Sequence, residues 1–176
     1  MITTIIILIV LAIAAILGLA AMKPDVFQVQ RQADIRGPRE KIFALLIDFN
    51  KWMQWSPWEK MDPALKRTYS GTPSGVGAVY AWEGNKKVGK GRMEIIEADR
   101  PSLVKLKLDF VAPFEAHNTA IFALAENDGV TRVMWTMSCR SPFMFKLMGL
   151  FTNMDKMIGK DFEAGLANMK AIAEGS

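Results

Sequence analysis

The chain begins with a long apolar run and continues as a mixture of polar and apolar residues. No charged side chain precedes Lys23, and Ile5–Met22 is unbroken by any polar residue. With the three residues before it, about 21 residues could enter a bilayer, close to the roughly 30 Å of a hydrocarbon core at about 1.5 Å per residue. A buried helix of a small soluble domain would show a polar stripe, which this run lacks. The pattern predicts a transmembrane anchor over residues 1–24 and a separate domain over residues 25–176.

A cleaved signal peptide is the alternative interpretation. Small residues between Gly18 and Ala21 would allow cleavage, but no Lys or Arg precedes the run, and it exceeds the usual apolar region of roughly 7–15 residues. The basic residues follow the run, at Lys23, Arg31, Arg36, Arg39 and Lys41. By the positive-inside tendency, we expect an anchored domain on the cytoplasmic face of the membrane. Cleavage would instead give an exported protein.

Beyond the run, alternation of polar and apolar residues predicts strands. Residues 26–35 form the first, and Pro38 then suits the first turn of a short helix. Glycine, proline and asparagine turns separate six further segments, at residues 65–70, 78–83, 90–98, 103–110, 117–125 and 131–139. This spacing is typical of an antiparallel meander. Residues 103–110 alternate most clearly, which predicts one covered and one solvated face.

A long amphipathic helix is predicted at the end of the chain. Ser141 and Pro142 are typical of a helix start. Apolar residues then recur every three or four positions from Met144 to Ile172, which predicts one uninterrupted helix over about 30 residues. A curved sheet packed on this helix would close a core between the two, giving an α+β fold.

An ordered series of residues carries a family resemblance: Pro38–Phe43, Phe49, Trp52, Trp55–Trp58, Gly77–Trp82, Gly89–Gly91, Met93, Ile95, Trp135 and Met154–Met169. In these residues the chain resembles the START-related helix-grip superfamily, the SRPBCC proteins, and within it the bacterial polyketide cyclase/dehydrase group. The resemblance covers residues 25–174. It implies a helix-grip fold, a curved antiparallel sheet around a long C-terminal helix, whose cavity holds apolar or amphipathic small molecules. Catalysis does not follow, because the superfamily includes lipid carriers, sensors, cyclases and regulatory modules.

Charge and composition argue against several classes of partner. The net charge is +4, and basic residues alternate with acidic ones rather than gathering on one face, so we expect no nucleic-acid partner. Basic residues near the anchor either contact anionic lipid headgroups or are simply solvated. With one cysteine, Cys139, and one histidine, His117, we expect no intrachain disulfide, no metal site and no Cys–His pair. No cofactor is expected.

The titratable residues give no clear catalytic candidate. The histidine and the strand carboxylates fall on the outward parity, so we expect them in solvent: His117, Glu83, Glu94 and Asp109. Asp155 and Asp161 lie beside the apolar stripe of the long helix, at a boundary position. General acid–base catalysis needs a carboxyl group inside the cavity with a raised pKa. Enzymatic activity is therefore the less favoured interpretation.

Tryptophan and methionine are the more informative residues. Three tryptophans fall within residues 52–58, and the chain has 12 methionines, whose adaptable side chains suit cavities for varied apolar ligands. Such residues either fill a core or line a partly open pocket, and in a helix-grip fold the two sets overlap. We expect the cavity wall or mouth to contain Trp52, Trp55, Trp58, Trp82, Met93, Phe110, Phe122, Trp135, Phe151, Met154, Ile158 and Phe162.

Residues 143–151 carry apolar side chains around most of the helix, too many for one buried stripe. We expect them to pack with Trp52, Trp55 or Trp58 and form a mobile pocket mouth.

Three functions remain open. The leading hypothesis is a membrane-anchored module that binds a hydrophobic or lipid-like small molecule without transforming it. The first alternative is an enzyme similar to polyketide cyclases or dehydratases. The second is a protein-interaction platform with a filled core, which docks a partner through the tryptophan segment at residues 52–58.

Overall fold

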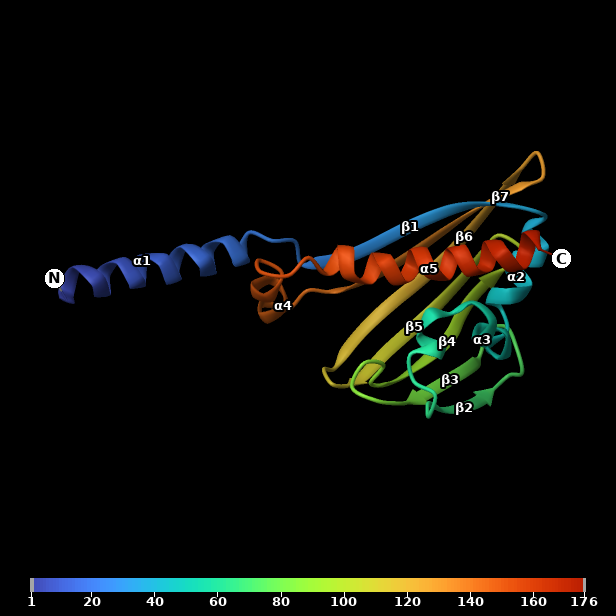
Figure 1. Cartoon of the computed structure of the whole chain (residues 1–176), viewed down its shortest axis with the longest axis horizontal. Helices are drawn as coiled ribbons and strands as arrows, with labels where there is room; N and C mark the ends of the chain where they lie inside the picture. The colour runs from blue at the N-terminus through green and yellow to red at the C-terminus, as the bar shows by residue number, and fades with distance from the viewer. Residues whose placement is uncertain (1, 176) are drawn as a thin grey trace.

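The computed structural model describes residues 2–175 (Figure 1). Met1 and Ser176, the outer ends of the predicted anchor and domain, lie outside the described residues. The elements run in the order α1 (Ile2–Ala21), β1 (Val26–Arg36), α2 (Arg39–Leu46), η1 (Phe49–Lys51), α3 (Trp52–Trp55), η2 (Pro57–Lys60), β2 (Lys66–Gly71), β3 (Ala78–Glu83), β4 (Lys90–Asp99), β5 (Leu103–Ala112), β6 (Ala116–Asn127), β7 (Val130–Arg140), α4 (Phe143–Met148) and α5 (Met154–Glu174).

One seven-stranded antiparallel sheet forms the body of the protein, which we define as residues 26–174. Its strand order is β1-β7-β6-β5-β4-β3-β2, a meander closed at one edge by β1. Helix α5 lies along the inner face of the curved sheet and packs most closely on β1 (Figure 1). The predicted α+β helix-grip fold is confirmed.

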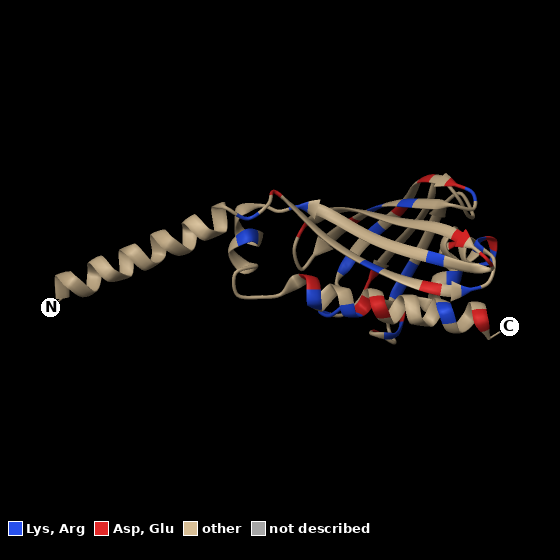
Figure 2. Ribbon diagram, turned by 90° about the horizontal axis from the view of Figure 1, so that it is seen from above, with Lys and Arg blue, Asp and Glu red and all other residues tan. Residues whose placement is uncertain are grey.

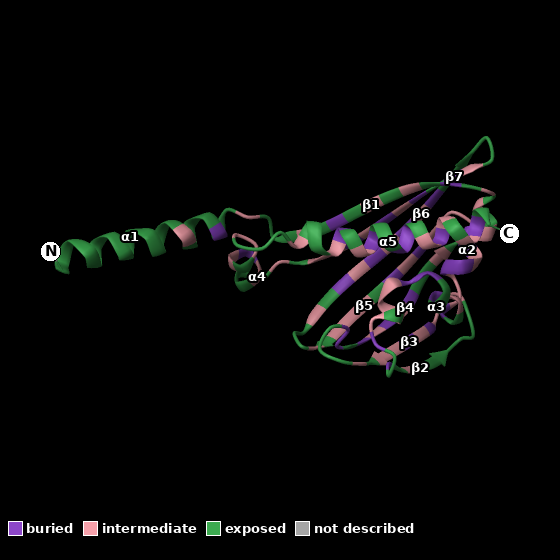
Figure 3. Cartoon of the chain, viewed as in Figure 1, coloured by how far each residue is buried: buried purple, intermediate pink, exposed green. Residues whose placement is uncertain are grey.

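The alternation of strand residues fills the space between sheet and helix. On β5, Val104 and Leu106 are buried on the inner face, while Lys107 is exposed on the other (Figure 3). Phe162 and Leu166 of α5 are buried against this inner face. Each such side chain stabilises the fold by about 1.5–3 kcal/mol relative to an exposed one.

The tryptophan segment is part of this core. Trp52 and Trp55 are buried, with ring centroids 4.6 Å apart. Their indole Nε1 atoms donate to the carbonyl oxygens of Leu46 and Leu45, at 3.1 and 3.2 Å, which fixes α3 against the end of α2. The two tryptophans thus belong to the core, through backbone partners and neighbouring rings that a sequence pattern does not show. That the segment forms a mobile mouth stays a prediction.

The C-terminal helix is interrupted, contrary to the prediction. Helix α4 ends at Met148, and α5 begins at Met154. Gly149, which disfavours continued helix, follows α4 directly. The side chain of Asn153 then accepts a hydrogen bond from the backbone N–H of Lys156 at 2.9 Å and so caps a new helix.

Helix α4 also packs differently from the prediction. It contacts the last turn of α1, where Ala20 is fully buried, whereas α3 and η2 pack against α5. The apolar residues of α4 therefore lie near the N-terminal helix and away from the tryptophan segment (Figure 1).

Helix α1 projects from the body, and nearly all of its side chains before Ala20 are exposed (Figure 3). It is 20 residues long, with a mean hydropathy of 3.0, and carries no charged residue (Figure 2). By length and composition it is able to cross a membrane, and an N-terminal signal sequence has the same properties.

The core position of Trp55 gives a stability prediction. Trp55→Ala should lower the free energy of unfolding by about 3–5 kcal/mol, because it leaves a cavity among packed rings. Denaturant unfolding of the full chain in mild detergent measures this. Met53, on the same short helix, is half exposed, and Met53→Ala should change the value by less than about 0.5 kcal/mol. Equal, small effects of both changes would contradict the core placement.

Candidate functional site

A cavity of about 1230 Å³ lies between the sheet and the first half of α5. Its walls come from the inner faces of β1 and β3–β7, from α3 and η2, and from α4, the segment after it and α5. Its floor is aromatic. Ligand pockets in proteins usually hold roughly 300–1,000 Å³, so this cavity has room for a large apolar molecule.

The structure places eleven of the twelve candidate residues on this cavity wall: Trp52, Trp58, Trp82, Met93, Phe110, Phe122, Trp135, Phe151, Met154, Ile158 and Phe162. Trp55 is the exception. It lies behind the wall in the core, in edge contact with Trp135 at 5.6 Å between ring centroids. Contact between these eleven residues and a ligand stays a prediction.

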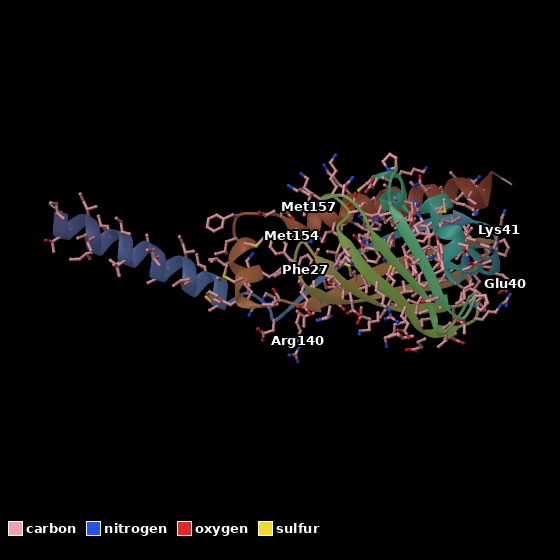
Figure 4. All side chains as sticks on the ribbon, turned by 90° about the horizontal axis from the view of Figure 1, so that it is seen from below. Phe27, Glu40, Lys41, Arg140, Met154 and Met157 are labelled. Atoms are coloured by element: carbon pink, nitrogen blue, oxygen red, sulfur yellow. The ribbon has the colours of Figure 1, made fainter. Side chains whose placement is uncertain are left out.

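The cavity opens at the end of the body nearest α1. Of the lining residues, Phe114 in the β5–β6 turn and Met157 on α5 are exposed, whereas Phe122 is fully buried. Figure 4 shows Met157 at the end facing α1, and Glu40 and Lys41 at the opposite end. The mouth therefore faces the region where α1 and α4 meet.

A carboxylate that the sequence analysis did not select lies in the cavity wall. Glu59, on η2, has a side chain only 6% exposed. Its Oε1 accepts a hydrogen bond from the Tyr80 hydroxyl at 2.5 Å, and its Oε2 accepts one from Arg67 Nε at 2.6 Å. Burial, together with the hydrogen bond to this carboxylate, raises the pKa of Tyr80. Both oxygens of Glu59 are thus engaged with neighbours from β2 and β3.

The second carboxyl group is Asp161 on α5, at the boundary position expected from its place beside the apolar stripe. Burial raises its pKa. Among the lining carboxylates of the described chain, it alone has no hydrogen bond or ion pair with another residue, since Asp155 pairs with Arg31 at 2.9 Å.

Further polar groups line the cavity. Asn118 of β6 is buried, and its amide nitrogen lies 3.3 Å from the carbonyl oxygen of Leu108. Trp135 Nε1 is buried without an acceptor among residues 2–175. Strand alternation places Asn118 on the inward face, but it was not predicted as a cavity residue because only apolar side chains were considered. Glu59 carried no such signal, because the segment that holds it is irregular in sequence.

The prediction that His117 faces outward, into solvent, is confirmed. His117 is two-thirds exposed on the outer side of β6, where its Nδ1 lies 2.7 Å from Asp109 Oδ1, and this contact raises the pKa of the imidazole. Within the described residues, no three His, Cys, Asp or Glu side chains are grouped to hold a metal ion.

The family model described as "Polyketide cyclase / dehydrase and lipid transport" matches residues 26–174. The chain belongs to this family. The predicted resemblance is confirmed at this level, and the matched span contains every element that lines the cavity. A search of curated proteins found no match.

Several solved structures have the same fold. The di-domain ARO/CYC protein BexL from the BE-7585A biosynthetic pathway has a TM-score of 0.61 at 12% identity, with 89% of this chain and 53% of BexL covered. The Aha1 dimer from Colwellia psychrerythraea has a TM-score of 0.60 at 16% identity, covering 84% and 96% of the two chains. Protein Ms6760 from Mycobacterium smegmatis has a TM-score of 0.57 at 18% identity, with 86% of this chain and 98% of Ms6760 covered. At these identities the likeness shows the fold alone.

The Glu59 cluster predicts a stability difference between two Glu→Gln changes. Glu59→Gln should lower the free energy of unfolding by about 1.5–3 kcal/mol, because Arg67 loses a charged hydrogen-bond partner that is shielded from water. The control Glu83→Gln removes an exposed pair with Lys90, whose atoms are 3.2 Å apart, and should cost less than about 1 kcal/mol. Urea unfolding at neutral pH compares them, and a cost at Glu83 equal to that at Glu59 would contradict the assignment.

Asp161 predicts a pH dependence of stability. Its folded-state pKa lies above the ordinary value of 3.8, so the folded state holds this proton more tightly than the unfolded state. The contribution of Asp161 to the free energy of unfolding therefore falls as pH rises from 3.8 through the raised pKa. Asp161→Asn should raise stability at pH 7 and lose that advantage in acid.

Asp34 supplies the control of opposite sign. Its hydrogen bond to Arg132 lowers its pKa, so Asp34→Asn should lower stability at pH 7 and not raise it. Unfolding curves at several pH values measure both variants. A drop in stability for Asp161→Asn at pH 7 would contradict the burial of its carboxyl group.

Proposed function

We propose that the protein is a membrane-anchored module that binds a hydrophobic or lipid-like small molecule without transforming it. The observation that carries the proposal is the cavity of about 1230 Å³, walled by aromatic and aliphatic side chains. The family description includes lipid transport, which is consistent with such a ligand.

The distribution of polar groups supports an amphipathic ligand. The deep wall is made of stacked rings, such as Trp135 and Phe162 with centroids 4.0 Å apart. Asn118, by contrast, lies near the start of β6, toward the mouth. A ligand with its apolar part deep and its polar group near the mouth would match this gradient.

The anchor assignment is the second part of the proposal. Residues 2–21 form the apolar helix α1, and basic residues follow it but do not precede it. We infer an anchor over residues 1–24 and a binding domain over residues 25–176, on the cytoplasmic face.

The absence of catalysis is inferred from the cavity carboxylates. Both oxygens of Glu59 are engaged, and within residues 2–175 no hydrogen bond or ion pair joins Asp161 to an acid, a base or a nucleophile. Asp161 is also the observation that favours the enzyme alternative, because its pKa is raised on a cavity wall. Mass spectrometry of a bound ligand before and after long incubation distinguishes the two.

The interaction-platform alternative loses support because Trp52 and Trp55 are buried. Neither ring is able to dock a partner without local unfolding.

A steric test of the cavity uses two alanines on β6. Ala116 lines the cavity, and Ala125, on the same strand, is exposed on the outer face. With the full chain in vesicles, a dansylated fatty acid should accept energy from the cavity tryptophans when bound. Ala116→Trp should weaken binding about tenfold or more, a loss of about 1.4 kcal/mol, because the indole occupies ligand space. The Ala125→Trp variant should bind the probe with the affinity of the unmodified protein. Equal affinities for the unmodified protein and both variants would contradict binding in the cavity.

A further inference from the structure

The depth of α4 relative to a bilayer follows from its contact with α1. Helix α1 has 20 residues, which at about 1.5 Å each gives the roughly 30 Å needed to cross the hydrocarbon core. Its whole length is therefore used in the crossing, and its last turn lies at the membrane boundary. Because α4 packs on that last turn, α4 lies at the same depth.

Polar contacts hold α4 in this position. The Lys146 ammonium of α4 lies 2.5 Å from Asp25 Oδ1 in the segment that leaves α1. The backbone N–H of Ser141 donates to the carbonyl of Asp25 at 2.8 Å, and Lys23 Nζ donates to the carbonyl of Gly149. Both ends of α4 are thus tied to the segment that follows the anchor.

Large apolar side chains are exposed around the same end of the body. We call them the collar: Phe114, Phe143, Met144, Met148, Phe151 and Met157. Phe151 is 75% exposed and Phe114 67%. Several large apolar side chains exposed at one end of a protein usually mark a contact with a membrane or another protein.

Basic side chains near the collar suit lipid headgroups. Lys87 and Lys156 are exposed near the mouth, and Figure 4 shows Arg140 at the end facing α1. Of the nearby acids, Asp25 and Asp155 are paired with Lys146 and with Arg31 of the body, and Glu115 lies 3.4 Å from His117 Nε2. Apolar side chains flanked by Lys and Arg are typical of segments that lie in a membrane interface.

We propose that the collar lies in the headgroup–acyl boundary of the bilayer crossed by α1, so that the cavity opens onto lipid. Phe114, Phe151 and Met157 belong both to the collar and to the cavity lining. A ligand would therefore pass from the bilayer into the cavity without crossing water. This inference rests on the proposed membrane anchoring.

Site-specific fluorescence in vesicles of phosphatidylcholine and phosphatidylglycerol tests the proposal. The full chain carries Cys139→Ser, which removes the native thiol, and a single new cysteine labelled with an NBD dye. Phe151→Cys and Phe114→Cys report on opposite sides of the mouth, and both side chains are exposed enough to leave the fold intact. Asp128→Cys is the control, in the β6–β7 turn at the far end of the body (Figure 1).

The dyes at positions 114 and 151 should emit at shorter wavelength than the dye at 128. Lipids spin-labelled near the headgroup should quench these two dyes and leave the dye at 128 unaffected. If the protein floats with vesicles but all three dyes report water, the collar proposal is wrong and the anchor stands. A blue shift without quenching by the spin-labelled lipids would mean that protein covers the collar, and this result would also overturn the collar proposal. Failure to float with vesicles would overturn the proposed anchor and the collar together.

Discussion

The stacking of Trp135 on Phe162 is the contact on which the arrangement of sheet and helix depends. The two rings are almost parallel, at 7°, with centroids 4.0 Å apart. Beyond Phe162, α5 is buried against the sheet through Leu166 and Met169. Before Phe162, the inward-facing helix residues, such as Met154 and Ile158, line the cavity. This one contact therefore separates a closed core from a cavity along the same helix.

Small residues on α5 permit the helix to approach its neighbours so closely. A Cβ atom at Gly165 would lie 2.9 Å from the ring of Trp135, and one at Gly159 would lie 2.0 Å from the guanidinium of Arg31. The Arg31 side chain binds Asp155 and Glu163, at 2.9 and 2.8 Å, on either side of Gly159. The cavity half of α5 is thus held to β1 by this cluster of ion pairs. The core half combines apolar packing with hydrogen bonds to β1, such as that from Lys170 Nζ to the carbonyl oxygen of Asp34 at 2.7 Å.

The sequence predicts what depends on local periodicity and misses what depends on tertiary contacts. Strand side chains alternate with a period of two whatever lies opposite them, so parity alone identifies inward residues such as Trp82 and Phe110. The break after α4 could not be read from the apolar spacing, which continues through residues 149–153. The burial of Trp55 could not be predicted either, because its position depends on a contact with α2. The pairing of Glu59 with Tyr80 joins an irregular segment to a distant strand and has no local sequence signal.

The segment between α1 and β1 limits how far the body can move away from α1. Only residues 22–25 separate the two elements, and fully extended they reach about 14 Å at most. With α1 held in a bilayer, the cavity cannot travel to a second membrane. Its encounters take place by diffusion within one plane, so any molecule that it holds must be passed to a partner at the same surface or returned to the same bilayer. If α1 is the proposed anchor, the short tether suits a local receptor or a hand-over step better than a carrier that leaves its membrane.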